Sequence, residues 1–88
     1  MEKGFRFSLV TGDATVYQGE VSYVNLPTAF GSVGILRGHA PMLCAVGKGV
    51  LRCTAEEGTL RFRVSDGVAS VANGEVTVLA GAAEAIES

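Results

Sequence analysis

The side chains that could do chemistry in this 88-residue sequence are few and scattered. The only histidine, His39, lies between Gly38 and an Ala-Pro pair, within the string GILRGHAPM of residues 34–42. A histidine in such a loop could act as a general base, a metal ligand or a packing residue. Ser32 precedes it and could act as a nucleophile only if its hydroxyl came within hydrogen-bond distance of His39.

Known catalytic motifs are incomplete in this sequence. FGSVG at residues 30–34 lacks the leading glycine of the GxSxG nucleophile elbow. The Gly-Lys pair at 47–48 lacks the remaining P-loop residues, so we interpret Lys48 as part of an exposed turn. One histidine and the separated Cys44 and Cys53 are too few for a four-ligand zinc site. We therefore predict no catalytic residue, metal or cofactor, and interpret both cysteines as reduced, packed thiols.

Composition favours one small domain over residues 1–88 that is partly covered by a partner. Hydrophobic residues make up 48% of the chain and charged residues only 18%. The net charge of −2, with no basic cluster, argues against nucleic-acid binding. No apolar run reaches the roughly 20 residues of a membrane span, and the first residues do not resemble a signal peptide.

The elements that must position these side chains are predicted to be strands, because apolar residues recur with period two. LRFRV at 60–64 alternates in this way, and Asp-Gly and Asn-Gly dipeptides mark tight turns. The predicted strands cover 4–11, 15–26, 33–36, 42–46, 49–55, 59–65, 68–72 and 75–80. The last four are expected to form an antiparallel meander, and the whole to form a β-sandwich or small barrel.

Three features of this pattern are irregular. The parity of the strand 15–26 changes along its length, which predicts a bulge near Gly19 or Tyr23. Pro27 is expected to end that strand. The short tail at 81–88 has a helical composition.

Four collinear stretches resemble the N-terminal domain of the epsilon subunit of F-type ATP synthases, whose mitochondrial counterpart is called delta. They are LPTAFGSVGILRGHAPML (26–43), GVLRC (49–53), FRVSDGVASV (62–71) and VTVLAGAAE (76–84), with GILxGHAP the most specific part. The resemblance implies an all-β fold: a flattened antiparallel β-sandwich of about ten short strands, here without the family's C-terminal helical hairpin.

The same resemblance implies a noncatalytic subunit of the central stalk, or rotor. Such a subunit links the gamma subunit to the ring of c subunits and helps couple ion translocation to ATP synthesis or hydrolysis. It would lie peripherally at the cytoplasmic face of the bacterial inner membrane, without inserting into it. Because the family's helical hairpin takes part in ATP binding, we expect no ATP binding by this chain.

Interface residues follow from the resemblance, position by position. The expected c-ring interface is Phe30, Gly31, Ser32 and Val33. The expected gamma interface is Thr11, His39, Met42 and Cys44. Since the family often has an acidic residue where Ser32 stands, the ring contact should be drier and less dependent on salt.

Two other functions remain open from the residues alone. A stand-alone β-sandwich that binds a small ligand or a peptide strand would be a stable monomer with a concave pocket and no affinity for gamma. A hydrolase using Ser32 and His39 would require their side chains to meet.

Overall fold

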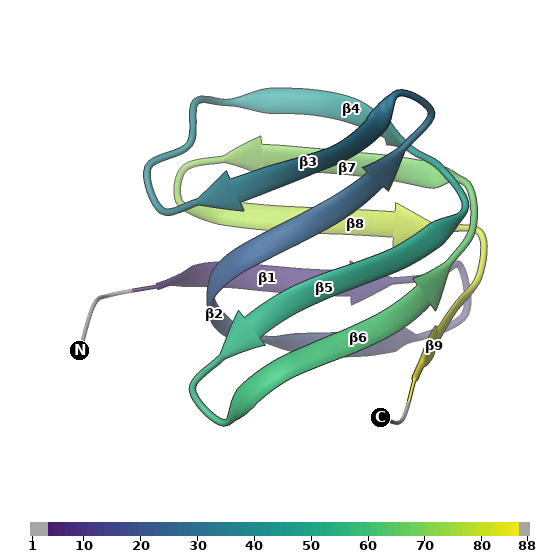
Figure 1. Ribbon diagram of the computed structural model, residues 1–88, viewed down its shortest axis with the longest axis horizontal. Coiled ribbons are helices and arrows are strands. Elements are labelled where there is room, and N and C mark those ends of the chain that lie inside the picture. Colours follow the sequence, from purple (N-terminus) through teal and green to yellow (C-terminus); the bar gives the residue numbers. More distant parts are fainter. Residues whose placement is uncertain (1–3, 87–88) are drawn as a thin grey trace.

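The computed structural model of the protein describes residues 4–86 and consists of strands joined by turns. In this part of the chain no helix is long and apolar enough to cross a membrane. The strands are β1 (Phe5–Val10), β2 (Thr15–Thr28), β3 (Gly31–Leu36), β4 (Met42–Val46), β5 (Gly49–Ala55), β6 (Gly58–Val64), β7 (Gly67–Ala72), β8 (Glu75–Ala80) and β9 (Ala83–Ala85) (Figure 1). The all-β fold class is confirmed, with nine strands between residues 4 and 86 where about ten were expected for the domain.

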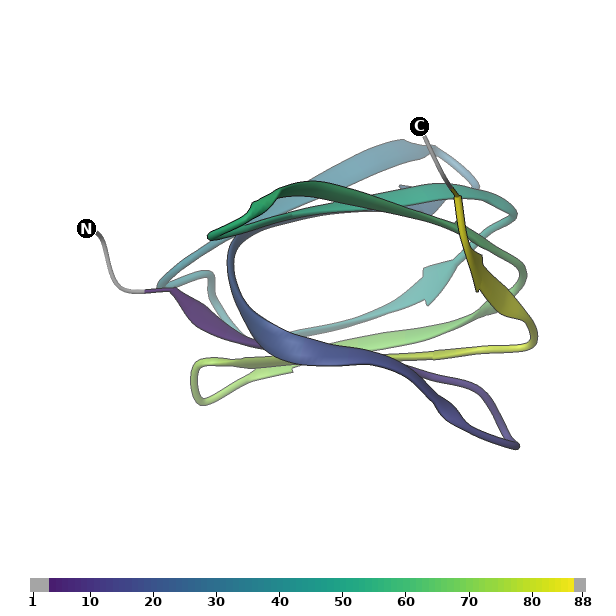
Figure 2. The same ribbon diagram turned by 90° about the horizontal axis from the view of Figure 1, so that it is seen from below.

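The strands form two layers that face each other across a shared core (Figure 2). The hydrogen-bonded order is β4-β7-β8-β1-β2-β5-β6-β9, and β3 pairs separately with β2. The first layer contains β4, β7, β8, β1 and the beginning of β2, and the second contains the rest of β2 with β3, β5, β6 and β9. One pair, β1 with β8, is parallel, which a long intervening connection allows.

Strand β2 belongs to both layers because it bends where its pairing changes. It pairs with β1 as far as Val21, with β5 from Val21 onward and with β3 from Tyr23 onward. Val21 faces Ala55 whereas Tyr23 faces Thr54, so Ser22 is an extra residue in the ladder. This bulge lies next to Tyr23, one of the two predicted places, and it lets Val21 and Val24 both point into the core.

One local prediction about a strand end is wrong. Pro27 does not end β2, which continues to Thr28. The Pro27 carbonyl accepts a hydrogen bond from the Gly47 N–H, and the β2–β5 ladder ends before Pro27, at Asn25. Proline is tolerated here because no β5 carbonyl needs the N–H that it lacks. The tail has a helical composition, yet Ala83–Ala85 forms a short strand that pairs with the edge of β6; residues 87–88 lie outside the described part.

The predicted meander over residues 49–80 is also wrong. β5 pairs with β6 and β7 pairs with β8, but β6 and β7 lie in opposite layers. Asp66-Gly67 therefore carries the chain across the sandwich and does not close a hairpin. The crossing places the buried residues of β6, which include Phe62, and those of β7, which include Val71, in opposite layers of one shared core.

Aromatic rings join the two layers inside the core. Phe7 of β1 lies with its ring centroid 6.0 Å from that of Tyr17, and Tyr17 lies 5.7 Å from Phe62 of β6. Each such pair contributes about 0.5–1.5 kcal/mol beyond the burial of its area. The sandwich is thereby held closed along the side where β1 and β6 lie.

Gly67 offers a test of the close packing where the chain enters the first layer. A methyl group there would lie 2.7 Å from the Cα of Ala80 and would overlap the carbonyl oxygen of Leu79. Because both atoms belong to the backbone of β8, the strand itself must shift. We expect Gly67→Ala to lower the free energy of unfolding by about 1–3 kcal/mol in urea denaturation.

Gly12→Ala is the matched control, because no atom lies within 4 Å of the position its Cβ would take. It should leave the stability unchanged or raise it slightly. Equal stability of the two variants would mean that β7 and β8 do not pack as described.

Candidate interaction surfaces

The turn between β2 and β3 presents a single aromatic side chain to solvent. Phe30 is 100% exposed at its tip. The hydroxyl of Thr28 accepts a hydrogen bond from the Phe30 N–H at 3.2 Å and donates one to the Gly31 carbonyl. Gly31 has a φ of 116°, which favours glycine. The backbone of the turn is thus held by its own hydrogen bonds, and Phe30 is left free for a partner.

The other residues expected at the c-ring follow this tip into β3. Gly31 and Ser32 are exposed, whereas Val33 is half-buried and packs against the core. The structure therefore brings the four together at one end of the sandwich, with Phe30, Gly31 and Ser32 at its surface and Val33 supporting them (Figure 1).

His39 stabilises the loop between β3 and β4. Its backbone N–H donates to the Leu36 carbonyl at 3.1 Å, and its Nδ1 lies 2.7 Å from the Ala40 carbonyl oxygen. A carbonyl can only accept, so this contact places the proton on Nδ1. Gly38, with a φ of 84°, permits the turn. His39 is exposed, and its ring bonds to the backbone of its own loop.

The proposed pairing of Ser32 with His39 has no geometric basis. Ser32 and Leu36 both lie on β3, four strand residues apart, which corresponds to about 13 Å, and His39 lies beyond Leu36. No hydrogen bond joins Ser32 to His39 in the described part of the chain. Residues 4–86 also contain no cluster of three or more potential metal-ligating side chains.

The side chains of β4 alternate between the core and the outer face, and two of the expected gamma contacts, Met42 and Cys44, point toward the core. Met42 and Cys44 are half-buried and pack against the core. Leu43, between them, is 75% exposed on the outer face. Sequence reasoning missed Leu43, although the same period-two rule that identified the strand would have placed it opposite Met42 and Cys44.

An apolar surface extends across the outside of the first layer. Ala45 pairs with Val68, Val68 with Leu79, and Leu79 with Val10, so that four strands contribute to one row. Val68 is 46% and Leu79 51% exposed. We call this row together with the adjacent Leu43 the apolar face. An exposed apolar patch of this kind on a small domain is typical of a protein interface.

The remaining expected gamma contacts lie at opposite corners of this layer. Thr11 follows β1, where its hydroxyl accepts hydrogen bonds from the N–H groups of Asp13 and Ala14, each at 3.3 Å. His39 lies beside the start of β4, at the far end. A partner that touches both Thr11 and His39 would therefore have to cover most of the first layer.

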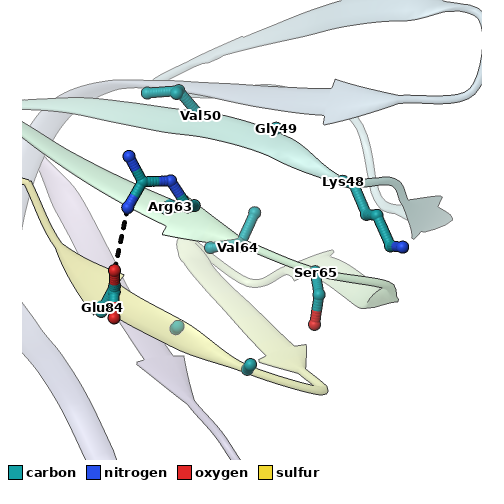
Figure 3. Close-up of a pocket in the computed structure, with 9 residues that line it drawn as sticks. Lys48, Gly49, Val50, Arg63, Val64, Ser65 and Glu84 are labelled. Atoms are coloured by element: carbon teal, nitrogen blue, oxygen red, sulfur yellow. Dashed lines mark hydrogen bonds and ion pairs between the residues drawn. The ribbon is translucent and has the colours of Figure 1, made fainter.

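The outside of the second layer is basic. Arg52, Arg61 and Arg63 project from β5 and β6, and we call these three residues the basic face. Arg63 donates a hydrogen bond to Glu84 at 2.8 Å (Figure 3). An open groove of about 540 Å³ adjoins this pair and is lined by residues 48–50, 63–65 and 82–84. Lys48 and Arg63 lie toward opposite ends of it (Figure 3).

Both cysteines are free thiols, but their surroundings differ. Cys44 is half-buried at the edge strand, and Cys53 is fully buried in the core. Burial, and to a smaller extent the negative charge of Glu57, raises the pKa of the Cys53 thiol from 9.0 to about 11. Cys53 is therefore a packing residue that stays protonated, as the sequence indicated.

Comparison with known proteins links this fold to one family. The model of the family described as "ATP synthase, Delta/Epsilon chain, beta-sandwich domain" matches residues 4–86. The ATP synthase epsilon chain of Synechococcus sp. (strain JA-2-3B'a(2-13)) is 46% identical over 76 residues, which cover 86% of this chain and 56% of that relative. The ATP synthase epsilon chain of Lawsonia intracellularis is 38% identical over 84 residues, covering 96% of this chain and 63% of the relative. The chain thus spans less than two thirds of their length.

Solved structures share the fold at lower identity. A chain in the cryo-EM structure of the Euglena gracilis mitochondrial ATP synthase (OSCP/F1/c-ring) superposes with a TM-score of 0.87 at 24% identity, covering 97% of this chain and 55% of that one. A chain of the Tetrahymena thermophila mitochondrial ATP synthase central stalk and c-ring gives a TM-score of 0.76 at 14% identity, covering 94% and 67%.

The raised pKa of Cys53 predicts how stability changes at alkaline pH. The folded thiol keeps its proton where the unfolded thiol has lost it, so this contribution is complete below pH 9.0 and is lost as the pH rises toward about 11. In urea denaturation across that range, Cys53→Ala should show a shallower alkaline decline than the unmodified chain. Cys44→Ala, the control, should keep the full decline. Equal slopes for Cys53→Ala and the unmodified chain would contradict the assignment.

Proposed function

The chain belongs to the family of ATP synthase delta/epsilon chain β-sandwich domains, and from this membership we propose that it is a noncatalytic subunit of the central stalk. In this role it links the gamma subunit to the ring of c subunits and turns with them. It thereby helps couple ion translocation to the synthesis or hydrolysis of ATP in the synthase complex.

The observation that carries this proposal is the presence of two separate apolar contact surfaces on one small domain. Phe30 is fully exposed at the tip of the β2–β3 turn, at one end of the sandwich. The apolar face lies on the outside of the first layer, toward one end, and belongs to β4, β7, β8 and β1. A subunit that connects two partners requires two such surfaces, each too apolar to remain in water without cost.

We assign the gamma subunit to the apolar face. Apolar side chains in register across four strands, with Leu43 exposed beside them, form a surface that matches a broad, flat protein partner. Thr11 and His39 lie at the corners of this layer, so a partner of that breadth reaches both. Met42 and Cys44 contribute indirectly: they pack against the core and so position β4, and with it Leu43, at the surface.

We assign the c-ring to the tip formed by Phe30, Gly31, Ser32 and Val33. The tip carries no charged side chain, so its contact relies on the burial of Phe30. Neutral contacts of this kind are only weakly screened by salt. The rotor would therefore hold the ring through a dry contact.

The complex that contains this subunit would lie peripherally at the cytoplasmic face of a bacterial inner membrane. Support comes from the bacterial ATP synthase epsilon chains that the chain resembles. In this setting the domain performs no chemistry, since Ser32 and His39 are separated by the length of β3. Its contribution to ATP synthesis is mechanical.

Leu43→Glu tests the gamma assignment. A carboxylate at this position would have to be buried without a partner in the interface, so we expect affinity for an isolated gamma subunit to fall at least about tenfold. Isothermal titration calorimetry with the isolated gamma subunit measures this affinity. Val50→Glu places the same charge on the opposite layer, at a residue that is 42% exposed, and should bind gamma normally. Unchanged affinity of Leu43→Glu would instead favour a stand-alone binding module.

Phe30→Asp tests the c-ring assignment. Because Phe30 is 100% exposed, the substitution should leave folding intact while weakening attachment to the ring. In reconstituted vesicles we expect ATP hydrolysis to continue and ATP-driven ion pumping to fall several-fold. Val50→Asp, on the outer face of the second layer, away from both proposed contacts, serves as the control. With Phe30 present, pumping should resist about 0.5 M salt; a salt-sensitive contact would contradict the dry interface.

A further inference from the structure

The basic face lies on the side of the sandwich that the proposed function leaves unused. Arg52 of β5 and Arg61 of β6 are directly opposite each other in the ladder, and Arg63 pairs with Val50 two residues further along. Directly opposed residues have Cβ atoms about 4.5–5.5 Å apart, and diagonal neighbours about 7–8 Å. The three guanidinium groups therefore rise from a compact triangle on one surface.

Acidic side chains of the protein neutralise only part of the positive charge of these three arginines. Between residues 4 and 86, the only ion pair is that of Arg63 with Glu84. Glu56 and Glu57 lie at the β5–β6 turn, four residues along their strands from Arg52 and Arg61, which is about 13 Å. Like charges directly opposite in a sheet destabilise it. Arg52 and Arg61 are therefore arranged as though an external anion were to share them.

The one pair that does form is weak and exchangeable. The side chains of Arg63 and Glu84 are 63% and 68% exposed, so water screens their attraction. Glu84 lies on β9, a strand of three residues at the edge of the second layer. An incoming carboxylate could replace Glu84 at Arg63 at little cost, and Figure 3 shows the open groove beside the pair through which it would approach.

The shape of the surface favours a peptide over a single anion. Small anions prefer concave nests of backbone N–H groups, whereas these arginine side chains project from the outer face of β5 and β6. Guanidinium forks bind carboxylates in a bidentate manner, and carboxylates in a strand or helix recur every 5–7 Å, close to the spacing of the triangle. Nucleic acid is a poorer match, because the net charge is −2 and the opposite layer carries Glu20 and Glu75.

We propose that the basic face, Arg52, Arg61 and Arg63, docks an acidic segment of a partner protein that presents two or more carboxylates, and that Glu84 occupies part of this surface until the segment binds. The docking surface is on the opposite layer from the apolar face. A protein bound there could therefore attach to the domain while gamma remains in place.

Binding of a ten-residue poly-L-glutamate peptide to the 88-residue chain, followed by NMR amide shifts at low salt, tests the proposal. We expect shifts confined to β5, β6 and β9, absent with poly-L-glutamine and suppressed by about 0.5 M sodium chloride. Arg52→Gln with Arg61→Gln should weaken binding about tenfold. Shifts that centre on the first layer would overturn the proposal.

The matched control removes the same two charges elsewhere, as Arg6→Gln with Arg37→Gln, and should weaken binding less than twofold. Equal weakening by both double variants would mean that only net charge matters, and would refute a specific face. Glu84→Gln should leave binding intact or strengthen it, and a loss of binding would contradict the role of Glu84. If either double variant unfolds, Arg52→Gln alone replaces it, with Arg6→Gln as its control. Inorganic phosphate that reproduces the same shifts would identify a general anion site and overturn the peptide assignment.

Discussion

The architecture depends on one constraint, namely that a single strand must serve two layers. Strand β2 pairs with β1 in the first layer and with β3 and β5 in the second, and it changes layers at the extra residue Ser22. Without this bulge, the alternation that buries Val21 would expose Val24, because side chains reverse with every residue. The second half of β2 would then turn its apolar face to water, and the β2–β3 turn would lose its place at the end of the sandwich.

The shared strand also divides the surface into two outer faces of different character. The first layer has an apolar row at one end and a charged row of Glu20, Arg6 and Glu75 at the other, whereas the second layer carries Arg52, Arg61 and Arg63. The net charge of −2 conceals this separation. A small domain with so few charged residues can thus offer chemically distinct faces to different partners, since the sheet sorts alternate residues onto opposite sides.

Local patterns predicted the strands well and their partners poorly, for a physical reason. Alternation and turn dipeptides depend on neighbours in sequence, so β5, β6, β7 and β8 were recognised within one residue at each end. Whether Asp66-Gly67 closes a hairpin or crosses between layers depends on which distant surface covers Phe62, and no local signal contains that information. The edge strand β9 was not predicted, for the same reason. Its alanines are compatible with a helix, and only pairing with the edge of β6 makes it a strand. Family resemblance correctly indicated the sandwich, but the exposure of Leu43 required knowing the parity of β4.

The inward and outward alternation of β4 indicates the structural role of His39. Because a shift of one residue would turn Leu43 inward and Met42 outward, the loop before β4 must start the strand in one register only. His39 closes the loop onto Leu36 through its backbone and onto Ala40 through its ring, while Gly38 supplies the left-handed turn. Pro41 then fixes the φ of the residue that enters β4. His39 therefore supports the apolar face from outside it, because its hydrogen bonds help to hold the loop that starts β4 in this register.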